Sequence, residues 1–322
     1  MRYFKQYDDI IGYTLDEIKF IGDTDMNKNA VKQCSVDLDT QDFVNAIKAL
    51  GISGSEICIH SSMKSFGADF KCGIKGIIDA FLIQKCTIMV PTFSDIYEAR
   101  PVKKYMPERN GAGDYSYFFE KTYSDIKPFD VTSKEISVED MGLFAQYVLN
   151  CEKCVRGNHP LNSFTALGDS AKKLVSCQTY KDVYAPMRQL CDDDGYVLLM
   201  GVGLNVATII HYAEQVAGRT LFIRWAYNKD NDVIPVSSGG CSEGFENFKD
   251  ILSNSAKKVK VANSEWVCFK ATDIVNICKK YIKSNPVITH CNNKYCDRCN
   301  DAVCGGPVLS DDFWNDSLND TQ

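Results

Sequence analysis

His211 and Glu214 are the two residues of this sequence whose types and spacing best fit acid–base chemistry. They lie in residues 195–218, where an apolar run and a glycine turn precede an expected helix. A spacing of three puts both side chains on one helix face. A histidine held by a carboxylate is the usual general base near neutral pH, so the pair predicts proton transfer. Two metal ligands are the other interpretation, but the nearby sequence supplies no partners at definite positions.

Two further histidines stand at junctions of expected elements. His60 ends a short strand over residues 56–60, and His159 precedes Pro160. A lone histidine is most often an ordinary polar residue, and that remains the alternative for each. Three histidines at such junctions, each beside Ser, Thr, Asn or Glu, favour a site assembled where strands end.

A serine-rich loop over residues 61–67 follows the strand that ends at His60. Its Ser61, Ser62 and Ser65 offer hydroxyl and backbone N–H groups that suit a phosphate or a pantetheine chain. The loop lacks the Gly-Lys-Ser/Thr ending of a phosphate-binding P-loop. A simple strand-to-helix turn is therefore the alternative interpretation.

Four of the fifteen cysteines cluster near the C-terminus. Cys291, Cys296, Cys299 and Cys304 form the pattern C-x4-C-x2-C-x4-C, and four thiolates this close in sequence suit a tetrahedral zinc ion. The outer spacings are wider than in the usual paired-CxxC ribbon, so ordinary reduced thiols explain the pattern equally well. The scattered cysteines are typical of the reducing cytoplasm.

The order of expected elements predicts an α/β fold. A helix over 40–50 precedes the strand over 56–60, and a second helix over 73–83 leads to a strand over 87–90. We expect a single large domain with a central mixed or mostly parallel sheet flanked by helices. Its predicted parts are an N-terminal leader (1–39), a catalytic domain (40–285) and a Cys-rich C-terminal segment with a polar tail (286–322). The long polar and aromatic stretch 92–130 is typical of a lid or substrate loop.

Charge and hydropathy narrow the class of partner. A net charge of −6 and a pI near 5.4 argue against a nucleic-acid binder. No apolar run reaches the roughly 20 residues that span a bilayer. The charged N-terminus does not read as a signal peptide, so we expect a cytoplasmic protein that acts on a small molecule.

Three sequence blocks, in this order and spacing, resemble the aminoglycoside 3-N-acetyltransferase family. They are Ile59 to Gly67, Arg156-Gly-Asn-His-Pro160 continuing through Ser163 to Gly168, and Leu198 to Gly203 continuing to Thr208-Ile-Ile-His-Tyr-Ala-Glu214. Phe129-Asp130 and Met141-Gly142 also match short motifs of the family. The resemblance covers roughly residues 40–280.

The resemblance implies acetyl transfer from acetyl-CoA to an amino group of an amino sugar, by direct attack in a ternary complex. It implies that Thr208 faces the thioester and that Glu214 orients a catalytic histidine. We expect a monomer or a homodimer. It further implies a coenzyme A channel lined by the first serine loop and the Ser163 region, with His60, Ser61, Ser62, Lys64, Ser65, Phe66, Ser163 and Phe164 as candidates.

One family feature is missing. Relatives carry their proton-accepting histidine just before a Gly-x-x-Ser-Pro segment. Ala185-Pro186 fits the Ser-Pro position here, but no histidine lies between residues 160 and 210. Either His159 or His211 is then the base, or the chain binds coenzyme A or a partner without acetylating aminoglycosides.

Overall fold

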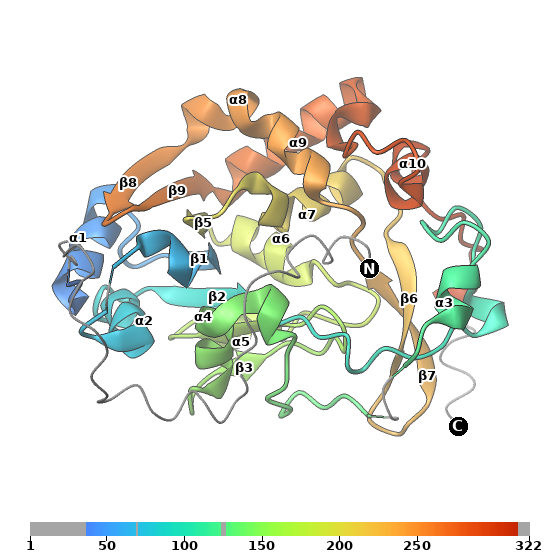
Figure 1. Cartoon of the computed structure of the whole chain (residues 1–322), viewed down its shortest axis with the longest axis horizontal. Coiled ribbons are helices and arrows are strands. Elements are labelled where there is room, and N and C mark those ends of the chain that lie inside the picture. The colour runs from blue at the N-terminus through green and yellow to red at the C-terminus, as the bar shows by residue number, and fades with distance from the viewer. Residues whose placement is uncertain (1–36, 69, 124–126, 315–322) are drawn as a thin grey trace, which may run out of the picture. The chain divides into compact units, whose positions relative to one another are not determined.

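The computed structural model describes residues 37–68, 70–123 and 127–314. In this part of the chain, helices cover a central sheet (Figure 1). The sheet's seven described strands stand in the order β3-β4-β2-β1-β5-β9-β8. They are β1 Glu56–Ser61, β2 Thr87–Pro91, β3 Val155–Arg156, β4 Phe164–Leu167, β5 Tyr196–Met200, β8 Lys257–Val261 and β9 Ser264–Lys270. Residues 1–36 of the expected leader and 315–322 of the expected tail lie outside the described residues.

The sheet is mixed, which is one of the two arrangements that the sequence left open. Strand β1 runs parallel to both β2 and β5 at the centre of the sheet. The outer pairs, β2 with β4, β4 with β3, β5 with β9 and β9 with β8, are antiparallel. The central strands are short apolar runs buried along most of their length, which is typical of a sheet covered on both faces.

Alternate residues of each central strand face two separate apolar cores. Ile57 and Ile59 of β1 pack into the first core, whereas Cys58 between them packs into the second. The first core is completed by helices α1 (Thr40–Leu50), α2 (Gly73–Ile83) and α4 (Val138–Asn150). The second is completed by α5 (Ala171–Val175), α6 (Ala185–Asp192), α7 (Ile209–Val216) and α9 (Ala271–Ser284). The result is a three-layer α/β/α arrangement.

Helix α1 shows how local sequence fixes an element's ends. The side chain of Asp39 accepts hydrogen bonds from the backbone N–H groups of Gln41 and Asp42. In return, the side chain of Asp42 accepts a hydrogen bond from the Asp39 N–H. At the other end Gly51 adopts φ 66°, a left-handed conformation that costs glycine little. The helix predicted over residues 40–50 is therefore present, with a cap at each end.

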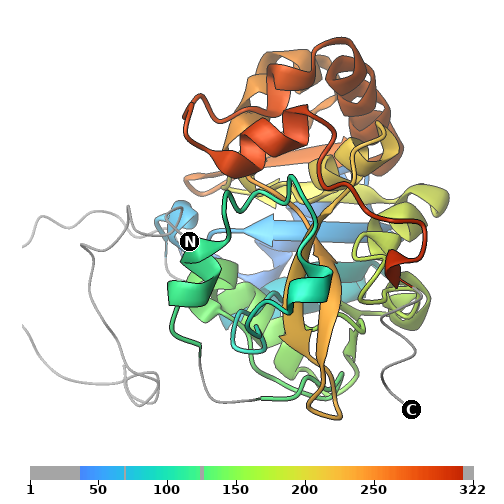
Figure 2. The ribbon, with the colours of Figure 1, turned by 90° about the vertical axis from the view of Figure 1, so that its right-hand side faces the viewer.

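A two-stranded hairpin, β6 (Phe222–Tyr227) and β7 (Val233–Ser238), lies beyond the carboxyl ends of the parallel strands (Figures 1 and 2). The described parts of the aromatic stretch, residues 92–123 and 127–130, contact this hairpin. Backbone bonds join Ala99 N–H to Trp225 O at 2.8 Å and Tyr227 N–H to Tyr97 O at 3.1 Å. Trp225 is buried among Tyr115, Phe118 and other aromatic residues, so part of the expected substrate loop forms a third, smaller core.

Several loops meet at the sheet edge where β1, β2 and β5 end. The residues that follow these strands are Ser62, Thr92 and Gly201, and the antiparallel β4 and β9 begin at the same edge. Ligands of open α/β sheets bind outside the carboxyl ends of the strands, so this edge is where a site is expected. No helix among the described residues is both long and apolar enough to cross a membrane.

Candidate active site

The glycine turn after β5 is shaped by close packing. Gly201 has φ 68°, and a Cβ atom at this position would lie 1.9 Å from Ser65 Oγ and 2.6 Å from Ser264 Oγ. A side chain would therefore displace the loop after β1 that the Ser65 hydroxyl anchors. The turn leads through a short 3-10 helix, Leu204–Val206, into α7.

Helix α7 carries a buried histidine–carboxylate pair. His211 Nδ1 and Glu214 Oε2 are 2.7 Å apart, and both side chains are almost removed from solvent. With Glu214 ionised, Nδ1–H donates to the carboxylate, which fixes the tautomer and leaves the lone pair on Nε2. Within the described residues no group hydrogen-bonds Nε2. The ring is thus arranged as a proton acceptor.

Glu214 is held from its other side by Arg219. The second carboxylate oxygen pairs with Arg219 Nη1, and that nitrogen also donates to Thr289 Oγ1 at 2.7 Å. The guanidinium balances the carboxylate charge in a buried place where an isolated charge would be costly. Because Thr289 lies in the 3-10 helix Pro286–Thr289, the C-terminal part of the chain helps to orient His211.

Aromatic rings and a backbone segment enclose the His211 ring. Tyr184 stacks on it with ring centroids 5.9 Å apart at 11°, and Phe245 meets it edge-on at 4.7 Å. A Cβ atom at Gly239 would lie 2.3 Å from Tyr184 Oη and 2.8 Å from His211 Cδ2, so the chain after β7 needs a glycine here. Burial and the nearby charge of Glu214 raise the pKa of Tyr184, which keeps its hydroxyl protonated.

His159 has no ring nitrogen left for a substrate. Nε2 bonds the carbonyl oxygen of Ser237 in β7 at 2.8 Å. Nδ1 accepts the backbone N–H groups of Leu161 at 3.2 Å and Asn162 at 2.9 Å. Burial lowers the pKa of His159 to about 4, so the ring is neutral at pH 7. The His159 ring therefore links the loop before β4 to β7, the hairpin strand that leads to Gly239.

Thr208 stands one turn before His211 and bonds to it through the backbone. His211 N–H donates to Thr208 O at 3.0 Å, and the spacing of three puts both side chains on the same side of the helix. Within the described residues no hydrogen bond engages the Thr208 hydroxyl. The hydroxyl is therefore available as a donor.

The residues predicted to line a coenzyme A channel separate into two groups. Ser61, Ser62 and Lys64 are partly or fully exposed at the sheet edge. The side chains of His60, Phe66 and Phe164 are buried, Phe66 in the first apolar core and Phe164 in the second. The Ser65 hydroxyl bonds Ser264 Oγ at 2.8 Å, and Ser163 Oγ accepts from Arg156 Nε at 2.8 Å, so both serve the fold.

Two residues in the stretch without a histidine were not singled out from the sequence. Gln178 is buried and joins three backbone groups: its Oε1 accepts Phe164 N–H, and its Nε2 donates to Asn162 O and Val183 O. Tyr184 stacks on His211, as described above. No local pattern marks either residue, because their partners lie on other elements.

The predicted set of cysteine ligands needs one correction. The sulfur atoms of Cys241, Cys291, Cys296 and Cys299 all lie within 4.8 Å of one another. Cys304 is exposed and is not part of this group. The fold brings in Cys241 from the loop after β7 in its place, a residue fifty positions earlier than Cys291.

Three carboxylates, those of Asp95, Glu139 and Asp140, lie where α4 begins. Asp95 accepts a hydrogen bond from Ser137 Oγ at 3.0 Å. Partial desolvation and the charges of Asp95 and Glu139 raise the pKa of Asp140 to about 6. Like charges held close together favour the approach of a cation.

Comparison with known proteins identifies the family. Residues 58–283 match the family model described as aminoglycoside 3-N-acetyltransferase. The chain belongs to this family. It is 23% identical over 269 residues to the aminoglycoside N(3)-acetyltransferase III of Salmonella sp, covering 76% of this chain and 91% of that relative.

Solved structures of such enzymes share the fold. A mutant of the aminoglycoside acetyltransferase AAC(3)-IVa in complex with a gentamicin superposes with a TM-score of 0.68 at 20% identity, covering 85% of this chain and all of that one. The binary complex of AAC-IIIb with CoASH gives a TM-score of 0.61 at 16% identity, covering 77% and 97%. The predicted family and fold class are confirmed.

Proposed function

We propose that this protein transfers the acetyl group of acetyl-CoA to an amino group of an aminoglycoside or a related amino sugar. Membership of the family supports the reaction class. A solved relative in complex with a gentamicin and another with CoASH support the two substrates. The observation that carries the proposal is the 2.7 Å contact between His211 Nδ1 and Glu214, which leaves Nε2 as an acceptor.

In the proposed reaction, His211 Nε2 accepts a proton from the substrate ammonium, directly or through water. The freed amine attacks the thioester carbonyl carbon, and a C–N bond forms as the carbonyl becomes an oxyanion. The oxyanion collapses and the C–S bond breaks; the attacking nitrogen gives its second proton to the leaving thiolate, and the proton held by His211 passes to water. No covalent enzyme intermediate is needed, because positioning both substrates in a ternary complex supplies much of the rate.

Thr208 is the proposed donor to the oxyanion. Its hydroxyl lies one helical turn from His211 and carries no hydrogen bond within the described residues. A donor that is already placed where negative charge develops is worth far more than one that must reorient.

His159 is better suited to positioning than to base catalysis. Both of its ring nitrogens are occupied by backbone groups, and its strand partner Ser237 lies two residues before Gly239, which contacts the His211 ring. Of the two histidines that the sequence left open as base, the geometry therefore favours His211.

For coenzyme A, Ser61, Ser62 and Lys64 are the proposed contacts. They lie at the sheet edge, where the two serines are partly exposed and Lys64 is exposed, and the Lys64 ammonium suits a phosphate group. The other candidates would not contact coenzyme A but would stabilise the conformation of this edge by packing and hydrogen bonds; they are His60, Phe66, Phe164, Ser65 and Ser163. Asp95 and Asp140 are the proposed contacts for the cationic sugar.

An acetyl-transfer assay tests the proposal. Purified protein is mixed with acetyl-CoA and a panel of gentamicin, apramycin and simple amino sugars, and thiol release and product mass are followed. We expect thiol release that depends on the amine, with a product heavier by one acetyl group. Release without an amine, or coenzyme A binding without turnover on any amine, would contradict the proposal; the second result would favour a binding protein that has lost the reaction.

A further inference from the structure

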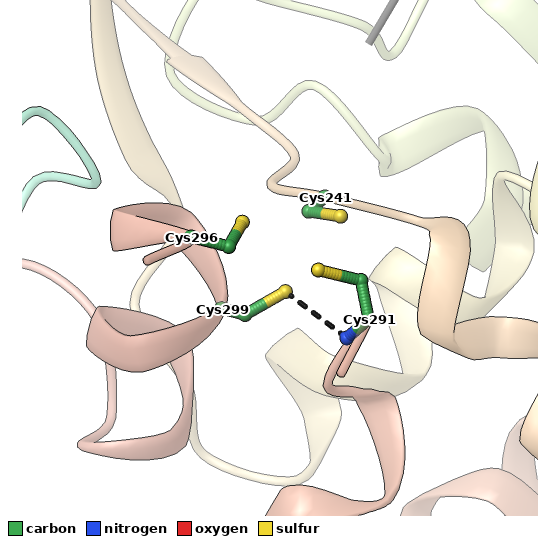
Figure 3. Close-up of side chains that lie close together, drawn as sticks. All are labelled: Cys241, Cys291, Cys296 and Cys299. Atoms are coloured by element: carbon green, nitrogen blue, oxygen red, sulfur yellow. Dashed lines mark hydrogen bonds between the residues drawn. The ribbon is translucent and has the colours of Figure 1, made fainter. Parts of the chain in front are cut away.

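Four cysteine side chains converge where the C-terminal segment meets the hairpin (Figure 3). Cys241 follows β7, Cys291 follows the 3-10 helix Pro286–Thr289, and Cys296 and Cys299 stand at the start of α10 (Asp297–Val303). Cys241, Cys296 and Cys299 are buried and Cys291 is half-buried. Three separate turns of the chain therefore aim their sulfur atoms at one interior point.

The spacing of the sulfur atoms suits a tetrahedral metal ion. A Zn–S bond of about 2.3 Å places the four sulfurs of a tetrahedron roughly 3.8 Å apart. Here all four lie within 4.8 Å of one another, and none of them is in a disulfide. A small inward movement of the side chains would complete the coordination sphere. Elsewhere among the described residues, no cluster of three or more His, Cys, Asp or Glu ligand atoms is this compact.

A backbone N–H group already contacts one of the four sulfur atoms. Cys291 N–H donates to Cys299 Sγ at 3.4 Å, a contact visible in Figure 3. Such N–H to sulfur contacts orient metal-bound thiolates and stabilise their charge. Cys296 and Cys299 are three residues apart, which puts both on the same side of the chain as it enters α10.

We propose that Cys241, Cys291, Cys296 and Cys299 bind one structural zinc ion. Four protein thiolates close the coordination sphere, so the ion has no open position for a substrate. The set differs from the one that the sequence spacing favoured, because Cys241 replaces Cys304. The ion joins the loop after β7 to the C-terminal segment, two segments that are far apart in sequence.

The zinc ion would also brace the His211 site, and this part rests on the proposed function. On one side, Cys241 lies two residues from Gly239, which packs against Tyr184 and the His211 ring. On the other side, Cys291 lies two residues from Thr289, which bonds Arg219 and through it holds Glu214. The Asn247 side chain also stabilises the turn that carries Thr289, by donating to Ile288 O at 2.8 Å. Zinc at this point would hold in place both segments that position the His211–Glu214 pair, the one with Gly239 and the one with Thr289.

Metal analysis of the full-length protein tests the site without any activity measurement. We expect about one zinc per chain in the purified wild type, released when a mercurial reagent blocks the thiols. Replacing zinc by Co²⁺ should give the intense visible absorption of a tetrahedral thiolate complex. Reduced protein that holds no metal in zinc-containing medium, or that holds iron instead, would overturn the assignment.

Matched variants test which cysteines are ligands. Cys241→Ser and Cys291→Ser should each lose most of the bound zinc, whereas Cys304→Ser should keep it. Zinc loss in Cys304→Ser together with retention in Cys241→Ser would refute the set proposed here. If the ligand variants do not fold, the metal content and cobalt spectrum of the wild type still decide the question.

The bracing role has its own test. Removing zinc from the wild type by chelation should lower the thermal midpoint by roughly 5 °C or more and make the C-terminal segment more susceptible to protease. Where acetyl transfer is measurable, kcat should fall with zinc content. Full activity in zinc-free protein would refute the brace, while the metal content would still decide the site itself.

Discussion

His159 and His211 are both nearly removed from solvent, but different groups hold their rings. Backbone groups occupy both nitrogens of His159: a carbonyl of β7 on Nε2 and two N–H groups on Nδ1. A carboxylate occupies one nitrogen of His211, and within the described residues the other bears no hydrogen bond. The first arrangement fixes a neutral ring as a structural link. The second stabilises the protonated ring that a general base becomes.

The comparison predicts that His211 governs the rate of reaction. His211→Ala should lower kcat by roughly 10²- to 10⁴-fold, the usual contribution of a positioned general base, and should leave the protein folded. Steady-state kinetics with acetyl-CoA and the best amine of the panel measure the effect. Added imidazole should restore part of the rate by entering the vacated space. An unchanged kcat would remove His211 from the mechanism.

Glu214 should contribute to the rate through His211. Glu214→Gln removes the charge that stabilises the protonated ring, and kcat should fall by about 10²-fold. The same change leaves the buried Arg219 without its counter-charge, which destabilises the fold by about 3 kcal/mol or more.

A double variant separates the two effects of Glu214. Glu214→Gln combined with Arg219→Gln removes both charges, so part of the stability should return while kcat stays low. Kinetics and urea unfolding on the single and double variants measure this. Recovery of kcat in the double variant would mean that Glu214 acts only by holding the fold together.

The two histidines also show how far sequence can predict a site. The contact of His211 with Glu214 is local to one helix, and a spacing of three was enough to predict it. The role of His159 depends on Ser237, 78 residues later, and nothing near His159 in sequence marks that partner. Cys241 was missed for the same reason, since only the fold brings the loop after β7 to the C-terminal cysteines.

The fold was more predictable than the site. Short apolar runs alternating with amphipathic helices are enough to indicate a sheet covered on both faces. The serine loop was correctly placed after β1 from its sequence pattern. The sequence could not show that the Ser65 hydroxyl is occupied by Ser264 or that the Phe66 ring lies in the core, because both depend on long-range packing.

Changing His159 should affect stability more than rate. His159→Ala leaves one carbonyl and two N–H groups without their buried partner, and we expect a loss of about 2 to 4 kcal/mol in the free energy of unfolding. Below the lowered melting temperature, kcat should stay within roughly tenfold of the wild type, since the ring touches no reacting atom. A kcat as low as that of His211→Ala, in a variant of near wild-type stability, would reverse the assignments.

The smallest expected effect is a change in the pH dependence of stability. Burial lowers the pKa of both His60 and His159 to about 4, from an ordinary value near 6.5. As pH falls from 6.5 to 4, these side chains take up protons in the unfolded state but stay neutral in the folded state. The unfolded state therefore gains protons first, and the protein loses stability across this window.

His159→Gln isolates one of these two contributions, because glutamine keeps a hydrogen-bonding amide but does not titrate in this range. Urea unfolding at several pH values between 7 and 4.5 should show that the variant loses stability less steeply than the wild type. The difference should approach about 1.4 kcal/mol per pH unit, the value for one proton. Equal slopes would mean that His159 takes up its proton in the folded protein as readily as in the unfolded chain. Burial of the His159 ring would then not keep it neutral, and the structural role assigned to it by contrast with His211 would lose this support.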